Sequence, residues 1–165
     1  MIPTASQTVG PFFNFGLTKN ADLGMVPLEG ERIRLEFLVL DGDGVPTPGD
    51  SMIELWQADA AGRYNRGFGR LDTDANGLCA FDTVKPGSIG EGHAPHICVT
   101  VFARGLLRHL STRVYFDGEA LNEHDPVLVL VPEARRATLL ARRVENTWRM
   151  VIRLQGDEET VFFDL

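Results

Sequence analysis

Cysteine and long apolar runs are both scarce in this sequence. The 165-residue chain has 2 cysteines, Cys79 and Cys98, too few for a disulfide framework, so each is expected to be a buried thiol in a reducing compartment. No stretch reaches the ~18 apolar residues that a membrane span requires. The N-terminus also lacks a cationic start followed by an apolar signal core. These absences predict a cytoplasmic protein.

Positive charge is also in short supply. Lys and Arg number 16 against 23 Asp and Glu, which gives a net charge of −7 and a pI near 5.0. This balance argues against a nucleic-acid backbone or an anionic membrane as the partner, and it leaves small molecules and proteins. Nucleotide-binding glycine motifs and the G-x-S-x-G motif are absent, so neither a nucleotide site nor a serine nucleophile is indicated.

Apolar side chains alternate with polar ones along short segments. Residues 32–39 follow this pattern, which is typical of a half-buried strand. Asp and Gly at 41–44 favour a hairpin or a tight reversal between this strand and the next. Similar runs occupy 51–57, 78–82, 96–103, 112–116, 127–131, 148–154 and 160–164. Short strands separated by turns predict a mainly β chain, folded as an antiparallel sandwich or barrel. With 44% hydrophobic residues, one domain over residues 1–165 is expected.

Two segments depart from the strand pattern. Residues 132–143 are rich in helix formers, with Pro and Glu at the start and Arg at the end, and they predict one short helix. Residues 1–30 have few strand signals and several Gly and Pro residues. They are expected to form an N-terminal arm laid over a surface of this chain or of a partner.

The segment Asp72–Gly77 resembles part of a calcium-binding loop, but the residues that follow it exclude one. Its first half matches the calcium-binding loop of an EF-hand, but the twelfth position is Thr83 where a bidentate Glu is required. The flanking segments also read as strands. A turn rich in Asp, Asn and Gly explains the same residues.

The residues with the most chemistry are Tyr64, His93, His96 and Cys98. His96 and Cys98 lie two apart on a predicted strand, so both side chains point to the same side and could face one ion. Zinc accepts a mixture of nitrogen and sulfur ligands, whereas a ferric ion prefers oxygen and imidazole. The residues alone leave open a metal site or ordinary packing.

Arg104 is the other candidate binding residue. It follows a predicted strand and precedes Gly105, which allows the chain to turn. The pattern fits either a solvated strand end or a cation presented to a ligand.

Several stretches, in this order, make a specific combination. They are Ser6–Pro11, Glu54–Asp59, Gly62–Tyr64, Thr83–Gly87, Ala94–Ile97, Phe102–Gly105, Arg113–Asp117 and Gln155–Asp164. Over nearly the whole chain they resemble the intradiol ring-cleaving dioxygenases. The last stretch and Phe102–Gly105 resemble the alpha-type chains of those members that are built from alpha and beta chains. The resemblance implies an antiparallel β-sandwich.

The resemblance also bears on iron. In iron-bearing members two tyrosines and two histidines hold a ferric ion, and Tyr64 and His96 match two of these positions. Ile89 and Cys98 replace the other two ligands, and His93 lies near the place of an arginine used in catalytic chains. Isoleucine has no donor atom, and a lost phenolate leaves the ferric charge less neutralised. The resemblance therefore implies Fe(III) in a beta-type partner and none on this chain, with Tyr64 and His96 hydrogen-bonded to each other or nearby.

The resemblance implies that this chain helps to wall the substrate pocket of its partner. The matching positions are Thr8, Gly10, Pro11, Phe12 and Arg104, with the arm 1–30 at the subunit interface. A guanidinium suits the carboxylate of a carboxylated catechol, which would be cleaved with O2. No catalytic residue is then expected on this chain alone. The alternatives are an altered metal site made of Tyr64, His93, His96 and Cys98, or a purely structural scaffold.

Overall fold

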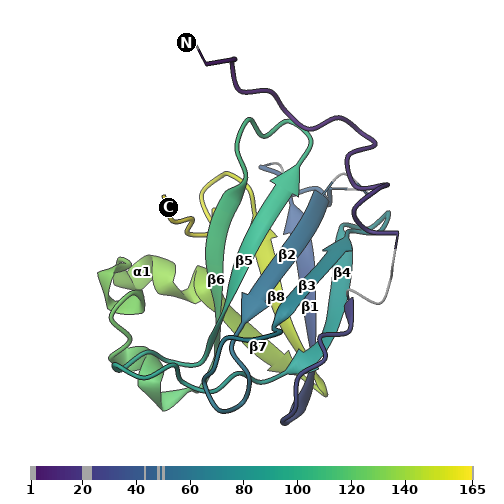
Figure 1. Cartoon of the computed structure of the whole chain (residues 1–165). Coiled ribbons are helices and arrows are strands. Elements are labelled where there is room, and N and C mark those ends of the chain that lie inside the picture. The colour runs from purple at the N-terminus through teal and green to yellow at the C-terminus, as the bar shows by residue number, and fades with distance from the viewer. Residues whose placement is uncertain (1–2, 20–23, 43, 48, 50, 165) are drawn as a thin grey trace.

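The computed structural model describes the chain except for residues 1–2, 20–23, 43, 48, 50 and 165 (Figure 1). The chain is mainly β, and its described strands are β1 (Arg32–Leu40), β2 (Ser51–Gln57), β3 (Phe68–Asp72), β4 (Leu78–Val84), β5 (His96–Ala103), β6 (Leu110–Phe116), β7 (Leu140–Val144) and β8 (Thr147–Arg153). The described helical segments are short: η2 (Ala120–Glu123), η3 (Leu128–Leu130), α1 (Glu133–Arg136) and η4 (Ala137–Leu139). No helix of the described residues is long and apolar enough to cross a membrane.

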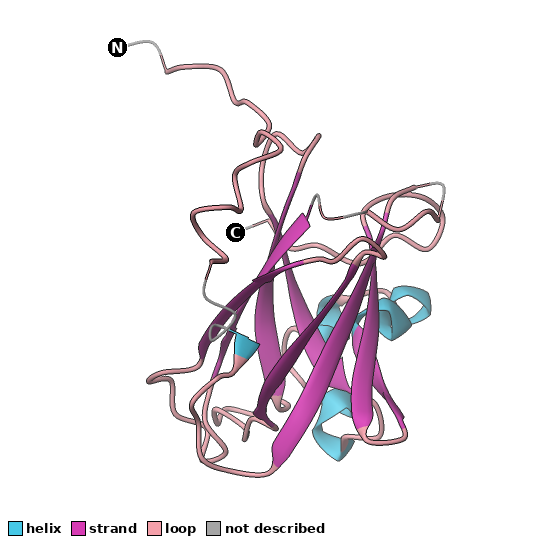
Figure 2. Ribbon diagram, turned by 90° about the vertical axis from the view of Figure 1, so that its right-hand side faces the viewer, coloured by secondary structure: helices cyan, strands magenta, loops and turns pink. Residues whose placement is uncertain are grey.

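The strands form two layers that face each other. One layer holds β1, β4, β7 and β8, and the other holds β2, β3, β5 and β6. β7 joins the layers because it pairs with β8 and, over a short stretch, with β6. The pairs β1–β8 and β6–β7 are parallel and the others are antiparallel. Figures 1 and 2 show the resulting sandwich, with the short helices at one side. The predicted β-sandwich is confirmed.

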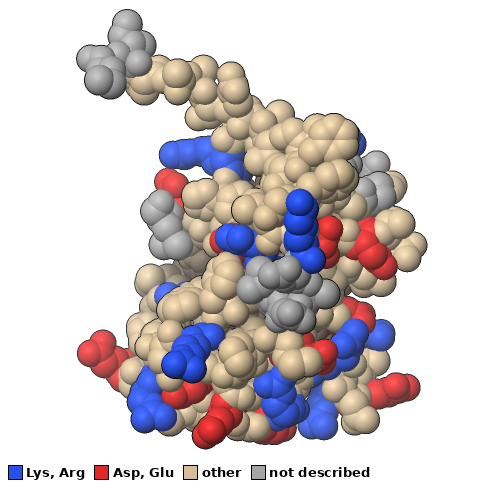
Figure 3. Space-filling view, turned by 45° about the vertical axis from the view of Figure 1, so that its right-hand side comes forward, with Lys and Arg blue, Asp and Glu red and all other residues tan. Residues whose placement is uncertain are grey.

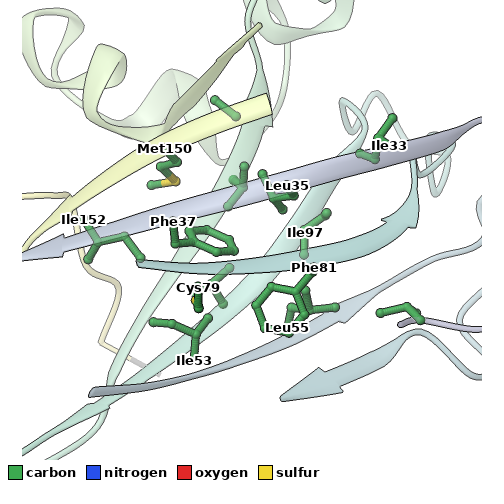
Figure 4. Packing of buried hydrophobic residues seen from close by; sticks show 14 of the residues in the cluster. Ile33, Leu35, Phe37, Ile53, Leu55, Cys79, Phe81, Ile97, Met150 and Ile152 are labelled. Carbon is green, nitrogen blue, oxygen red and sulfur yellow. The ribbon is translucent and has the colours of Figure 1, made fainter. Parts of the chain in front are cut away.

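The core lies between the two layers. The alternation predicted for residues 32–39 is confirmed: Leu35 and Phe37 of β1 are fully buried, while Arg34 and Glu36 face outward. Phe37 meets Phe81 of β4 edge-on, with ring centroids 6.0 Å apart. Figure 4 shows these rings packed with side chains of the facing layer, including Ile53. Each such fully buried side chain stabilises the fold by about 1.5–3 kcal/mol.

The chain reversal after β1 differs in part from its prediction. Asp41 and Gly44 form a tight turn, with hydrogen bonds from the Asp41 N–H to the Val45 carbonyl and from the Gly44 N–H to the Asp41 carbonyl. Asp43 lies outside the described residues. However, β1 and β2 are not partners in a hairpin, because each strand enters a different layer.

The segment 73–77 is a turn between β3 and β4, as predicted. The carboxylate of Asp74 accepts hydrogen bonds from the N–H groups of Asn76 and Leu78, which hold the pKa of Asp74 below its ordinary value. Gly77 has a φ of 73°, and a side chain there would collide with the Val39 carbonyl. These contacts account for the Asp, Asn and Gly residues without any bound calcium.

Three of the predicted elements are wrong in part. The predicted strand 127–131 is the helical turn η3, and the predicted strand 160–164 makes a single bridge from Phe163 to Ser111. The predicted helix 132–143 begins as expected after Pro132, but α1 ends at Arg136 and residues 140–143 belong to β7. β7 forms because its backbone pairs with β6 and β8 while Ala141 is buried in the core, so tertiary contacts override helix propensity.

Candidate functional site

The candidate metal residues gather on the outer face of the β2–β5–β6 layer. Ile97 and Val99 of β5 face the core, so His96 and Cys98 face the other way. Cys98 stands opposite Trp56 of β2 and Arg113 of β6. Strand geometry alone therefore brings the predicted pair onto one face.

Tyr64 lies over this face and contacts Cys98. Its ring stacks on Trp56, with centroids 6.1 Å apart and planes 9° from parallel. Burial, together with the neighbouring Cys98 thiol, raises the pKa of Tyr64 to about 12. Burial likewise raises the pKa of Cys98, which is hydrogen-bonded to the Tyr64 hydroxyl. The pair is thus a neutral phenol and a neutral thiol at physiological pH. The hydrogen-bond partner of Tyr64 is Cys98, and His96 bonds elsewhere.

His96 is buried at the start of β5, with 3% of its surface exposed. Its Nδ1 lies 2.8 Å from the Ala94 carbonyl oxygen, so Nδ1 carries the proton and donates it. Burial lowers the pKa of His96, which keeps the ring neutral. The other ring nitrogen, Nε2, is therefore left without a proton.

Asp125 is the candidate site residue that the sequence did not reveal. It is fully buried, and its carboxylate accepts hydrogen bonds from the N–H groups of Ala94, Val127 and Leu128 and from the Tyr115 hydroxyl. Burial alone would raise its pKa, but these hydrogen bonds hold the pKa of Asp125 below its ordinary value. The available signal was an Asp before Pro126 at the start of an apolar run, a common way to begin a helical turn.

One group of side chains in the described part of the chain could hold a metal ion. Ligand atoms of His93, His96 and Asp125 lie within 4.8 Å of one another. His93 Nδ1 lies 3.4 Å from Asp125 Oδ2, and it is buried with no hydrogen-bond partner. Cys98, which the sequence placed in the same set, is not part of this group.

The four positions that match the iron ligands of the family do not fit a ferric ion. Ile89 is half-buried and has no donor atom. Cys98 offers a thiol where the family has an imidazole. At these four positions a ferric ion would therefore find one phenol and one imidazole in place of the two phenolates and two imidazoles that balance its charge.

The candidate substrate residues lie at the other end of β5. The Gly105 N–H donates to the Thr8 Oγ1 at 2.6 Å, which ties the N-terminal arm to the loop that carries Arg104. Figure 1 shows the arm passing the end of β5. Arg104 and Phe12 are exposed, and the Phe12 ring packs on Phe15.

Gly10 is not required by packing within this chain. A Cβ added there would meet no atom of the chain within 4 Å, and its neighbour Pro11 is exposed. The arm is anchored further along, where the buried Asn14 amide donates to the Asp72 carboxylate. The anchored arm thus presents Thr8 to Phe12 on an open surface.

The two candidate clusters are well separated. Cys98 lies in the first half of β5, and Arg104 directly follows the last residue of the strand. The nearly extended chain between them covers about 20 Å at ~3.3 Å per residue. Arg104 thus lies beyond one end of β5, and His96 begins the other end. The two clusters are therefore separate candidate sites.

Comparisons with known proteins agree with this fold. The family described as Dioxygenase matches residues 13–152. The protocatechuate 3,4-dioxygenase alpha chain of Burkholderia cepacia is 43% identical, over 98% of this chain and 97% of that protein. The alpha chain of Pseudomonas putida is 41% identical over similar shares, and the beta chain of Burkholderia cepacia is 37% identical over 83% of this chain and 66% of that protein.

Solved structures show the same architecture. The dioxygenase domain of a carbohydrate-binding fusion protein from Streptomyces sp. SirexAA-E superimposes with a TM-score of 0.64 and 25% identity, covering 92% of this chain and 96% of that one. An intradiol ring-cleavage dioxygenase from Tetranychus urticae gives a TM-score of 0.66 at 17% identity, over 81% of this chain and 85% of that chain, which supports the fold alone.

Proposed function

The chain belongs to the dioxygenase family, and we propose that it is the iron-free alpha chain of a protocatechuate 3,4-dioxygenase. The assembly with a beta chain would take both oxygen atoms of O2 into 3,4-dihydroxybenzoate, between the two hydroxyl-bearing carbons, to give 3-carboxy-cis,cis-muconate. Fe(III) on the beta chain would supply the oxygen chemistry. As an enzyme of aromatic catabolism the assembly is expected in the cytoplasm, with this chain as one domain and its arm, residues 1–30, at the subunit interface.

The observation that carries the proposal is the hydrogen bond between Thr8 and Gly105. It joins the arm to the Arg104 loop about 20 Å from the positions that match the family's iron ligands. Residues that resemble substrate contacts therefore sit together where this chain has no metal ligands of its own. They make sense as one wall of a pocket whose iron comes from the partner.

The proposed wall binds and orients the substrate. The Arg104 guanidinium would hold the protocatechuate carboxylate by paired, charge-assisted hydrogen bonds. Gly10 allows a close approach of the backbone, and Pro11 and Phe12 add a stiff apolar surface. Orientation of this kind contributes to rate even though the reacting atoms lie on another chain.

Replacement of Arg104 in the reconstituted complex tests this role. We expect Arg104→Ala to lower kcat/KM for protocatechuate about ten- to hundredfold, since one charge-assisted contact is lost. Catechol, which has no carboxylate, should be turned over equally by both forms. Arg143→Ala, an exposed arginine on β7, is the control. Unchanged kinetics for protocatechuate in an intact assembly would contradict the pocket-wall role and favour a scaffold.

A divalent-metal site at His93, His96 and Asp125 is a second candidate. Two ligand atoms bound at ~2.0–2.1 Å to a tetrahedral zinc ion lie about 3.3 Å apart. His93 Nδ1 and Asp125 Oδ2 are separated by 3.4 Å without a hydrogen bond between them. This ligand set differs from the one considered from the sequence, because it contains Asp125 and lacks Tyr64 and Cys98.

Metal analysis of the separately purified chain distinguishes the two candidates. Stoichiometric zinc or iron that is lost in His96→Gln and kept in His124→Gln, a change of an exposed histidine, would favour the chain's own metal. A metal-free chain that still supports turnover with the beta chain would favour the pocket-wall function.

A further inference from the structure

A hollow lies on the outer face of the β1–β4–β7–β8 layer, away from both clusters described above. It has a volume of about 370 Å³ and lies between the α1–η4 segment and the outer face of β7 and β8. The side chains of Arg135, Arg142, Arg149 and Arg153 line it. The chain as a whole carries a net charge of −7, so a gathering of arginines is not expected from composition.

The arginines are placed at a cost to the fold. Arg142 of β7 and Arg149 of β8 are directly opposite each other in the antiparallel pair, and like charges in that position are destabilising. Arg149 is compensated by Glu36 at 2.9 Å. Arg142 has no ion pair or side-chain hydrogen bond with any described residue.

Donor groups of these arginines remain unused. The buried Nε of Arg135 has no acceptor in the described part of the chain, although its other guanidinium end donates to the Glu159 carbonyl at 2.6 Å. Arg153 pairs with Glu158 at 3.2 Å, but Glu158 is largely exposed to solvent. An anion entering the hollow would therefore find free donors on Arg142, whereas the unpaired Nε of Arg135 is buried and lies out of its reach.

We propose that this hollow binds a small organic anion with two or more carboxylates. Guanidinium groups hold carboxylates by paired hydrogen bonds, and Ala137, Leu140 and Val151 offer apolar lining for the carbon skeleton. The volume is that of a small-ligand site. Asp157 and Glu158 also line the hollow, so their charge opposes any anion there and the four arginines must outweigh it. The proposal does not depend on the function proposed above.

Calorimetric titration of the full-length chain with citrate, at fixed ionic strength in chloride, tests the site. Saturable binding is expected, and Arg142→Gln should weaken it at least about tenfold through the lost charge-assisted contact. The control Arg34→Gln removes the same charge from β1 of the same layer, where Arg34 pairs with Asp82 outside the hollow. It should change the affinity less than twofold. Absence of binding, equal weakening by both variants, or tighter binding of inorganic phosphate than of citrate would overturn the proposal.

Thermal unfolding gives an independent readout. In chloride buffer Arg142→Gln should raise Tm by about 1–3 °C, because the repulsion from Arg149 is relieved. Citrate should raise the Tm of the unchanged chain but not that of the variant. A variant that is less stable and still gains from citrate would assign Arg142 a structural role instead.

Discussion

Asp59 shows how one carboxylate positions a candidate site residue. It accepts hydrogen bonds from the N–H groups of Ala61 and Arg63, from the Arg63 guanidinium and from the Asn65 amide. The backbone hydrogen bond from Arg63, followed by those from Ala61 and the guanidinium, holds the pKa of Asp59 below its ordinary value even though burial opposes this. These bonds fix the loop that lays Tyr64 on Trp56.

The lowered pKa predicts a pH-dependent effect of Asp59→Asn. Because the folded pKa lies below the unfolded value of about 4, the ionised carboxylate adds stability above pH ~4, and this is lost as pH falls through the folded pKa. The urea midpoint of the variant should thus be lower at pH 7, with a smaller gap near pH 3. Asp117→Asn, at an exposed site, serves as the control. A gap that stays constant across this range would contradict the assignment.

The two thiols should react slowly in the folded chain. Burial raises the pKa of Cys79 and of Cys98, and Tyr64 covers Cys98. We expect little modification by a disulfide reagent at pH 8, since the thiolate is the reactive form. Tyr64→Ala should speed the reaction of Cys98 several-fold and leave Cys79 unchanged, with Cys98→Ser used to assign the signal. Equal reactivity of Cys98 with and without Tyr64 would show that the ring does not protect it.

At the scale of elements, β1 is the strand on which the sandwich most depends. It lies between β4 and β8, and its inward side chains fill the centre of the core (Figure 4). We expect Phe37→Ala to lower the free energy of unfolding by about 3–5 kcal/mol, since it removes a fully buried ring. Leu38→Ala, on the opposite and partly exposed face, should cost far less. Similar losses for both variants in urea unfolding would argue against this packing.

The strand predictions succeeded where one face of the strand is buried and the other is exposed. They failed where a single contact with another segment determines the local structure. The segment 32–39 alternates cleanly and was located from sequence, whereas β3 was missed because Gly67 and Gly69 resemble a loop. Gly67 is in fact required there, since a side chain would collide with the Gln57 carbonyl. The helical turn η3 was mistaken for a strand because Asp125, whose carboxylate accepts the Val127 and Leu128 N–H groups before the turn, gives no periodic signal.

The same distinction applies to the residues of the candidate sites: spacing within one strand was informative, and contacts between distant segments were not predictable. His96 and Cys98 share a strand, so their common face followed from spacing alone. Asp125 approaches His93 from a distant loop, and the contact of Thr8 with Gly105 spans most of the first hundred residues. Such long-range contacts depend on loop paths, and neither composition nor periodicity encodes those paths.

At the scale of the molecule, the N-terminal arm carries several exposed apolar side chains. Phe12, Phe15 and Leu17 are 70%, 60% and 41% exposed. Figure 3 shows an upper region of the surface with few charges, above a lower part where both signs are mixed. Exposed apolar surface of this kind marks an interaction site, which supports the proposed place of the arm at the beta-chain interface.

Loss of the two arm rings should affect assembly more than folding. Phe12→Ala with Phe15→Ala should leave the Tm of the isolated chain nearly unchanged, because both rings are exposed. Affinity for the beta chain should fall about tenfold or more if the rings are anchors. Val151→Ala, which removes an exposed apolar side chain on β8, is the matched control for assembly. Full affinity of the double variant would place the interface elsewhere.

The parallel pairing of β1 with β8 constrains how the chain can be made in a cell. β1 ends at Leu40, but its neighbour β8 begins only at Thr147, so β8 is synthesised long after β1. Until β8 has been synthesised, β1 has one edge unpaired and its apolar face is incompletely covered. Newly made chains should therefore need chaperone protection until β8 emerges, and a stop codon shortly before β8 should yield an aggregating product.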